Sequence, residues 1–185
     1  MKNILSASLV FLMAVIGNAQ NDAKTKSVNL SYGIKGGYNS FTERFSFEGD
    51  SASESGSGFY LGFFTDFSIT DKISIQPELL YILVTQYNTD GDVLVFPIMG
   101  KYKVKESFGI LLGPQLDYIL EKDVEDIKRL GLGLAAGVTF DISQSLFMDM
   151  RFSYGLSNRL GDAYDGFDAK LKVNFLQIGL GYKFK

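Results

Sequence analysis

The sequence predicts an all-β protein, an eight-stranded antiparallel up-and-down barrel that crosses a membrane with its strands. About eight segments alternate apolar and polar residues with the period of two that a pleated strand imposes. The connections between these segments are alternately long and short, as in outer-membrane barrels. Nearly all charged residues of the segments fall on one side, so the opposite side can face lipid.

A long hairpin over residues 73–103 is the clearest of these features. Each arm has one apolar face and one mixed face, and the Asp-Gly pair at residues 90–91 is typical of a tight turn, in which the central residues adopt positive φ. Depending on where this turn is centred, Glu78 lies opposite Lys101 or opposite Lys103. Both registers pair a carboxylate with an ammonium group on the mixed face, as charges inside a narrow membrane barrel require.

The start of the chain predicts a secretory signal peptide over residues 1–19. A short positive segment precedes the apolar run 4–16, and small residues stand before a cleavage site after Ala19. The apolar run is shorter than the roughly 20 residues that a membrane-spanning helix needs. We therefore expect residues 20–27 to form a short periplasmic arm and residues 28–185 to form the barrel.

The remaining segments are justified by the same alternation. The expected strands cover residues 28–39, 58–69, 73–83, 94–103, 108–120, 130–142, 146–157 and 175–184. Residues 40–58 are rich in Ser, Gly and acidic side chains and predict a surface loop, and residues 158–172 predict a second polar loop. Long loops of such barrels face outward and short turns face the periplasm. We therefore expect periplasmic turns near Asp71, Glu106 and Gln144.

Polarity separates the membrane barrel from a soluble barrel of the lipocalin type. A soluble barrel is polar outside and apolar inside, whereas here the charged residues share the face opposite to the apolar one: Lys35, Asp66, Glu78, Lys101, Asp117, Asp141, Asp149 and Arg151. A Lys or Arg facing lipid at the midplane costs about 2–4 kcal/mol. Tyr and Phe near the strand ends are typical of interfacial girdles. The polarity therefore favours the membrane barrel.

Several short motifs resemble the PorT-like outer-membrane β-barrel family. They lie at residues 33–39, 76–81, 96–98, 113–114, 151–156 and 181–184. The resemblance implies an eight-stranded barrel in a Gram-negative outer membrane. It also implies that Tyr182 and Phe184 form the C-terminal signal that the barrel-assembly machinery reads during insertion. Lys185 departs from the pattern, because many such proteins end on the aromatic residue.

The composition excludes several kinds of chemistry. The chain has no His and no Cys, which removes Ser-His-Asp triads, Cys nucleophiles, ordinary zinc sites and disulfides. The net charge of −3 argues against a nucleic-acid partner. We expect neither cofactor nor metal site.

Four charged residues are expected to form one interior ion-pair cluster: Glu78, Lys101, Asp149 and Arg151. An eight-stranded barrel is just wide enough for side chains to fill it, so such a cluster would plug the lumen. The expected function is that of a non-enzymatic outer-membrane barrel with a structural or interaction role in contact with lipid, for example as an accessory subunit of an outer-membrane complex. A small-solute pore is the alternative, and a lipid-modifying enzyme is a third possibility that the missing His disfavours.

Overall fold

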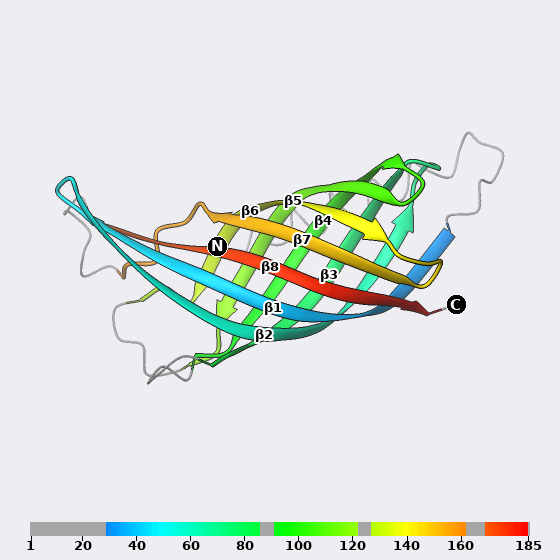
Figure 1. Cartoon of the computed structure of the whole chain (residues 1–185). Helices are drawn as coiled ribbons and strands as arrows, with labels where there is room; N and C mark the ends of the chain where they lie inside the picture. Colours follow the sequence, from blue (N-terminus) through cyan, green and yellow to red (C-terminus); the bar gives the residue numbers. More distant parts are fainter. Residues whose placement is uncertain (1–28, 86–90, 122–126, 162–168, 185) are drawn as a thin grey trace, which may run out of the picture.

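The computed structural model describes residues 29–85, 91–121, 127–161 and 169–184, which form a closed barrel of antiparallel strands (Figure 1). The strands are β1 (Asn29–Phe47), β2 (Asp50–Ser68), β3 (Ile73–Val84), β4 (Val93–Lys105), β5 (Phe108–Ile119), β6 (Leu130–Asp141), β7 (Leu146–Gly155) and β8 (Ala169–Phe184). Each strand pairs with its neighbour in sequence, and β8 pairs with β1. The predicted eight-stranded fold is confirmed. The expected signal peptide and arm lie outside the described residues.

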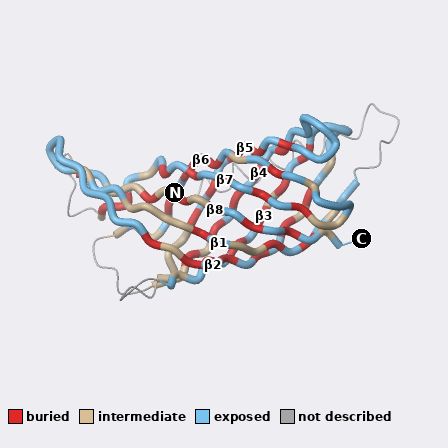
Figure 2. The backbone as a smooth tube through the Cα atoms, viewed as in Figure 1, coloured by how far each residue is buried: buried red, intermediate tan, exposed pale blue. Residues whose placement is uncertain are grey.

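The barrel has the polarity of a membrane protein. Burial alternates along the strands, as the alternating colours of Figure 2 show. Large apolar side chains point outward, with Phe63 66% exposed and Leu61 65% exposed. The inward face holds buried Lys35, Glu78 and Arg151. The described residues contain no helix that is long and apolar enough to cross a membrane.

The two ends of the barrel differ in their connections. Short turns join β2 to β3, β4 to β5 and β6 to β7 at the end where β1 begins and β8 ends (Figure 1). By the usual sidedness of such barrels this is the periplasmic end. At the opposite end β1 and β2 meet in a tight turn at Glu48 and Gly49, which have φ angles of 48° and 99°. Two successive residues with positive φ are typical of a hairpin turn that follows the twist of its strands.

The prediction of a surface loop over residues 40–58 is wrong, because β1 and β2 continue through this region. They stay paired as far as Phe47↔Asp50, and β1 stays paired with β8 as far as Phe47↔Ala169. The pairing of β2 with β3 begins only at Gly58↔Val84. Three strands therefore project beyond the rest of the barrel. We call this projection the outer sheet, made of residues 40–47 of β1, 50–57 of β2 and 169–174 of β8.

The polarity of the two faces reverses in the outer sheet. Within the barrel, β1 directs Tyr38 outward and Asn39 inward; beyond this point the outward positions carry Thr42 and Arg44, and the inward positions carry Phe41. The same change occurs in the paired strands: the outward positions carry Ser51, Ser53, Ser55 and Ser57 on β2 and Lys170, Lys172 and Asn174 on β8. A polar outer face suits water and not lipid. The reversal therefore places the outer boundary of the membrane near Tyr38.

Candidate functional site

The centre of the lumen is filled by four charged side chains from three strands. Lys35 comes from β1, Glu78 from β3, and Asp149 and Arg151 come from β7, where they are two residues apart and so share the inward face. All four are buried, with Arg151 and Lys35 each 1% exposed. We call these four residues the central cluster. Two carboxylates balance two cations, so the cluster as a whole is neutral.

The geometry of the central cluster ties opposite walls of the barrel together. Arg151 donates from Nη1 to Oε2 of Glu78 and from Nη2 to Oε1 of Glu78, both at 2.9 Å, which is a bidentate pair. Its Nη2 also donates to Asp149 at 2.5 Å. Lys35 Nζ lies 3.3 Å from Glu78 and donates to Asp149. Gln76 also donates to Glu78 at 2.8 Å. The carboxylate of Glu78 therefore contacts three side chains, those of Arg151, Lys35 and Gln76.

The structure brings together three of the four residues predicted to form one cluster. Glu78, Asp149 and Arg151 meet, but Lys101 lies apart, with its Nζ 3.8 Å from Asp66 Oδ2. The predicted pairing of Glu78 with Lys101 or Lys103 is wrong, because Lys101 stands opposite Ser74. Lys35 occupies the place expected for Lys101.

The periplasmic side of the central cluster is closed by aromatic rings. Phe64 and Phe147 meet edge to face, with ring centroids 5.3 Å apart. Lys183 Nζ lies 5.3 Å from the Phe147 centroid and donates to Asp141 at 2.8 Å. Gly181 faces the same ring, and a Cβ there would collide with it. The glycine on β8 thus makes room for the aromatic ring.

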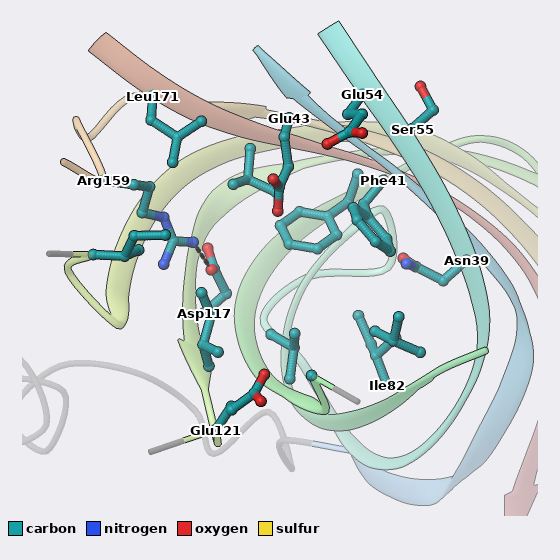
Figure 3. A pocket seen from close by; sticks show the side chains of 17 residues that line it. Asn39, Phe41, Glu43, Glu54, Ser55, Ile82, Asp117, Glu121, Arg159 and Leu171 are labelled. Atoms are coloured by element: carbon teal, nitrogen blue, oxygen red, sulfur yellow. Dashed lines mark hydrogen bonds and ion pairs between the residues drawn. The ribbon is translucent and has the colours of Figure 1, made fainter. Parts of the chain in front are cut away.

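The outer side of the central cluster is covered by an apolar layer. Buried side chains from four strands form it: Tyr60, Leu80, Ile82, Val93, Val95, Val173 and Phe175. Beyond this layer a cavity of about 290 Å³ opens at the outer mouth (Figure 3). Along the lumen the order is therefore aromatic pair, central cluster, apolar layer and outer cavity.

Sequence reasoning missed the charged pair at the outer cavity. Arg159, in the segment after β7, is 2% exposed and donates to the carboxylate of Asp117 on β5. It also donates to the carbonyl oxygen of Arg129 at 3.1 Å. Burial lowers the pKa of Arg159 to about 10, and the negative charge of Glu43 opposes this shift. Arg159 lies in a stretch predicted to be a polar loop, which gave no sign that its side chain turns inward.

Some interior polar side chains have no hydrogen-bond partner within the described residues. Both amide atoms of Asn39, Gln115 and Gln177 and the hydroxyl of Thr139 are buried in this way. A buried amide without a partner is costly, so these groups call for water or a ligand.

The described residues contain no group of three or more His, Cys, Asp or Glu that could hold a metal ion. The two carboxylates of the central cluster are paired with Lys35 and Arg151, and the apolar layer separates them from the outer cavity. They are therefore poorly placed for acid-base catalysis on a substrate.

The predicted assembly-signal residues Tyr182 and Phe184 face outward on β8, and their ring centroids are 5.8 Å apart. Their role in assembly stays a prediction.

The comparison with known families gives the identity at the level of the family. Residues 18–161 match the model of the outer membrane protein beta-barrel domain. The chain belongs to this family. It is an outer-membrane protein, as predicted.

Solved structures with a similar fold include three barrels. The attachment invasion locus protein Ail of Yersinia pestis has 17% identity and a TM-score of 0.49, with 83% of this chain and 98% of that chain covered. OprG from Pseudomonas aeruginosa has 16% identity and a TM-score of 0.48, with 85% and 97% covered. Neisserial surface protein A has 15% identity and a TM-score of 0.48, with 84% and 99% covered. No curated protein matches the sequence.

Proposed function

We propose that this barrel is a closed, non-enzymatic outer-membrane protein with a structural or interaction role, as an accessory subunit of an outer-membrane assembly. The observation that carries this proposal is the central cluster, which fills the lumen with a neutral, fully buried set of ion pairs. The resemblance of the motifs to the PorT-like family agrees with such a role. That resemblance carries no activity over to this chain, since most members of the family have no assigned activity.

The central cluster supports a lumen that stays shut. A solute crossing the barrel would have to separate Arg151 from Glu78, and breaking a buried pair by removing one partner costs about 3–5 kcal/mol. The apolar layer on one side and the Phe64–Phe147 pair on the other would have to part as well. A hydrated ion gains nothing from the apolar layer that would offset this cost.

The outer sheet supports an interaction role. It stands outside the membrane, and the outer part of β2 is paired with β1 but lies beyond the reach of the β2–β3 ladder. A sheet edge of this kind accepts a further strand from a partner through main-chain hydrogen bonds. Among the described residues at this end, the outer sheet is the largest region of regular strand pairing.

The composition supports the absence of an enzymatic role. The sequence has no His and no Cys, the residues on which most nucleophilic hydrolysis depends. Asp149 and Glu78, the carboxylates that come closest to an acid-base pair, are bound by Lys35 and Arg151.

A small-solute pore is the second candidate, because the interior amides without partners favour water in the lumen. Asn39, Gln115 and Gln177 would each hydrogen-bond to water in a hydrated barrel. This candidate requires a conducting path around the central cluster. It predicts a measurable single-channel current in planar bilayers.

The interaction role is tested by extracting the full-length protein from native outer membranes in mild detergent and identifying what remains bound. A shortened variant is compared, in which an Asn-Gly turn replaces residues 43–54 and joins the facing Thr42 and Ser55. A boiled and unboiled gel verifies that both proteins are folded. We expect a stoichiometric partner with the natural chain and its loss with the shortened one. A natural chain that emerges without a partner would contradict the subunit role.

A further inference from the structure

The outer cavity has apolar walls. Side chains from the rim of the barrel and from the inward face of the outer sheet line it, among them Phe41, Ile82, Val93, Val173 and Phe175 (Figure 3). Its volume of about 290 Å³ is near the lower end of the range for small-molecule sites. The cavity ends on the apolar layer, so it is a cup open to the outside and separate from the central cluster.

The charges around this cup are mainly negative. Among the described residues that line it, four carry carboxylates, Glu43, Glu54, Asp117 and Glu121, and one carries a guanidinium, Arg159. That guanidinium is already bound to Asp117. Within the described lining, Glu43, Glu54 and Glu121 therefore have no directly bound cation, and Arg159 acts on Glu43 only from a distance.

Two of these carboxylates are forced together by the fold. Glu43 on β1 stands directly opposite Glu54 on β2, and both line the cavity (Figure 3). Like charges directly opposite in a sheet destabilise it. Burial raises the pKa of Glu43, the negative charge of Glu54 raises it further, and Arg159 partly opposes the shift. A cation placed between the two carboxylates would relieve this repulsion.

A second and independent feature of the cup is the amide of Asn39. This side chain is 0% exposed, lines the cavity and points into it beside Phe41 (Figure 3). Neither its oxygen nor its nitrogen has a partner within the described residues. Buried amides are normally hydrogen-bonded, so this one is placed for a polar group that enters the cup.

We propose that the outer cavity is a binding site for a small organic cation with an apolar body, such as a primary amine on a short aromatic or alkyl group. The ammonium group lies between Glu43 and Glu54 and donates to both. The body packs against Phe41, Val173 and the apolar floor, and the amide of Asn39 takes up a remaining polar group. A metal ion fits less well, because the described residues contain no group of three or more carboxylates placed to hold one, and the walls of the cup are mainly hydrocarbon.

This site is independent of whether the barrel conducts or has a protein partner. The test uses the full-length protein refolded in lipid nanodiscs at neutral pH, with calorimetric titration. The probe is 2-phenylethylammonium, and the matched probes are 2-phenylethanol and 3-phenylpropanoate, which carry a similar body without the positive charge. We expect saturable binding of the ammonium probe and affinities about tenfold or more weaker for the other two, because hydrogen bonds to charged groups are the strong ones.

The Glu43→Gln/Glu54→Gln variant should weaken the ammonium probe by about tenfold or more. Glu106→Gln is the matched control, since it removes a carboxylate at the opposite end of the barrel and should leave the affinity unchanged. Phe41→Ala tests the apolar wall without changing charge and should also weaken binding. A gel of boiled and unboiled samples verifies folding for each variant. Equal binding of all three probes, or equal binding by the glutamine variant and the control, would overturn the proposal.

Discussion

Replacing Arg151 by Ala is the perturbation that acts most strongly on the central cluster. Arg151 is 1% exposed and makes two hydrogen bonds to Glu78 at 2.9 Å and one to Asp149 at 2.5 Å. Its removal leaves Lys35 as the one cation of the cluster facing two buried carboxylates. Breaking a buried ion pair in this way lowers the free energy of unfolding by about 3–5 kcal/mol.

The assay is equilibrium unfolding in urea, with the barrel refolded in phospholipid vesicles and followed by Tyr fluorescence, since the chain has no Trp. With an m value of about 3 kcal/mol per molar urea, the midpoint should fall by roughly 1–2 M. Arg44→Ala removes an exposed arginine of the outer sheet and should change the free energy of unfolding by at most about 0.5 kcal/mol. The double variant Glu78→Gln/Arg151→Met keeps the charges balanced and should lose less stability than Arg151→Ala. A midpoint for Arg151→Ala equal to that of Arg44→Ala would refute the cluster as the element that holds the lumen.

Three further predictions test other parts of the account by the same unfolding assay. Gly181→Ala should destabilise by about 1–3 kcal/mol, because the added methyl group collides with the ring of Phe147; an unchanged midpoint would show that the ring has room to move. Leu112→Arg puts a charge on the lipid face, where Leu112 is 55% exposed, and should cost about 2–4 kcal/mol, whereas Ser51→Arg on the outer sheet should cost almost nothing; equal effects would contradict the membrane boundary. The raised pKa of Glu43 means that the folded state holds the proton of this carboxyl group more tightly than the unfolded state does. The free energy of unfolding therefore falls as the pH rises through the range in which Glu43 loses its proton. Glu43→Gln should therefore raise the midpoint at pH about 7 and leave it unchanged well below pH about 4, and the opposite pH dependence would contradict the burial of this carboxyl group.

Most of the barrel could be predicted from the sequence, because lipid imposes a strict rule on one face of every spanning strand. An outward charge costs several kcal/mol, so the alternation is clean wherever the strand is in the membrane. The rule stops at the membrane surface, and there the prediction of a loop over residues 40–58 failed. The alternation persists in β1, with Phe41 and Phe45 on one face and Thr42 and Arg44 on the other, but on the opposite parity. When the apolar residues of a strand shift from its even to its odd positions, or the reverse, the shift thus indicates that the strand leaves the membrane.

The central cluster could be predicted only in part, because strand register is not fixed by a turn motif when the connection is long. The Asp-Gly pair led to a register in which Glu78 meets Lys101 or Lys103, whereas Lys101 stands opposite Ser74. The residues that point into the lumen were identified correctly, since the side to which a side chain points depends only on the two-residue period of the strand. Which of them meet across the lumen depends on the stagger of all strands around the barrel, which no local pattern encodes. Lys35 was therefore placed inside the barrel but not in the cluster.

Single-channel recording in planar bilayers tests the central claim most directly, which is that the lumen is closed by its own side chains. The folded natural chain is inserted at neutral pH, with insertion verified by protease protection and with a porin of known conductance as the positive control. The account predicts no unitary current above the background of the bilayer, because the central cluster and the apolar layer leave no path. Steady unitary currents from the natural chain would contradict it and would make the protein a pore.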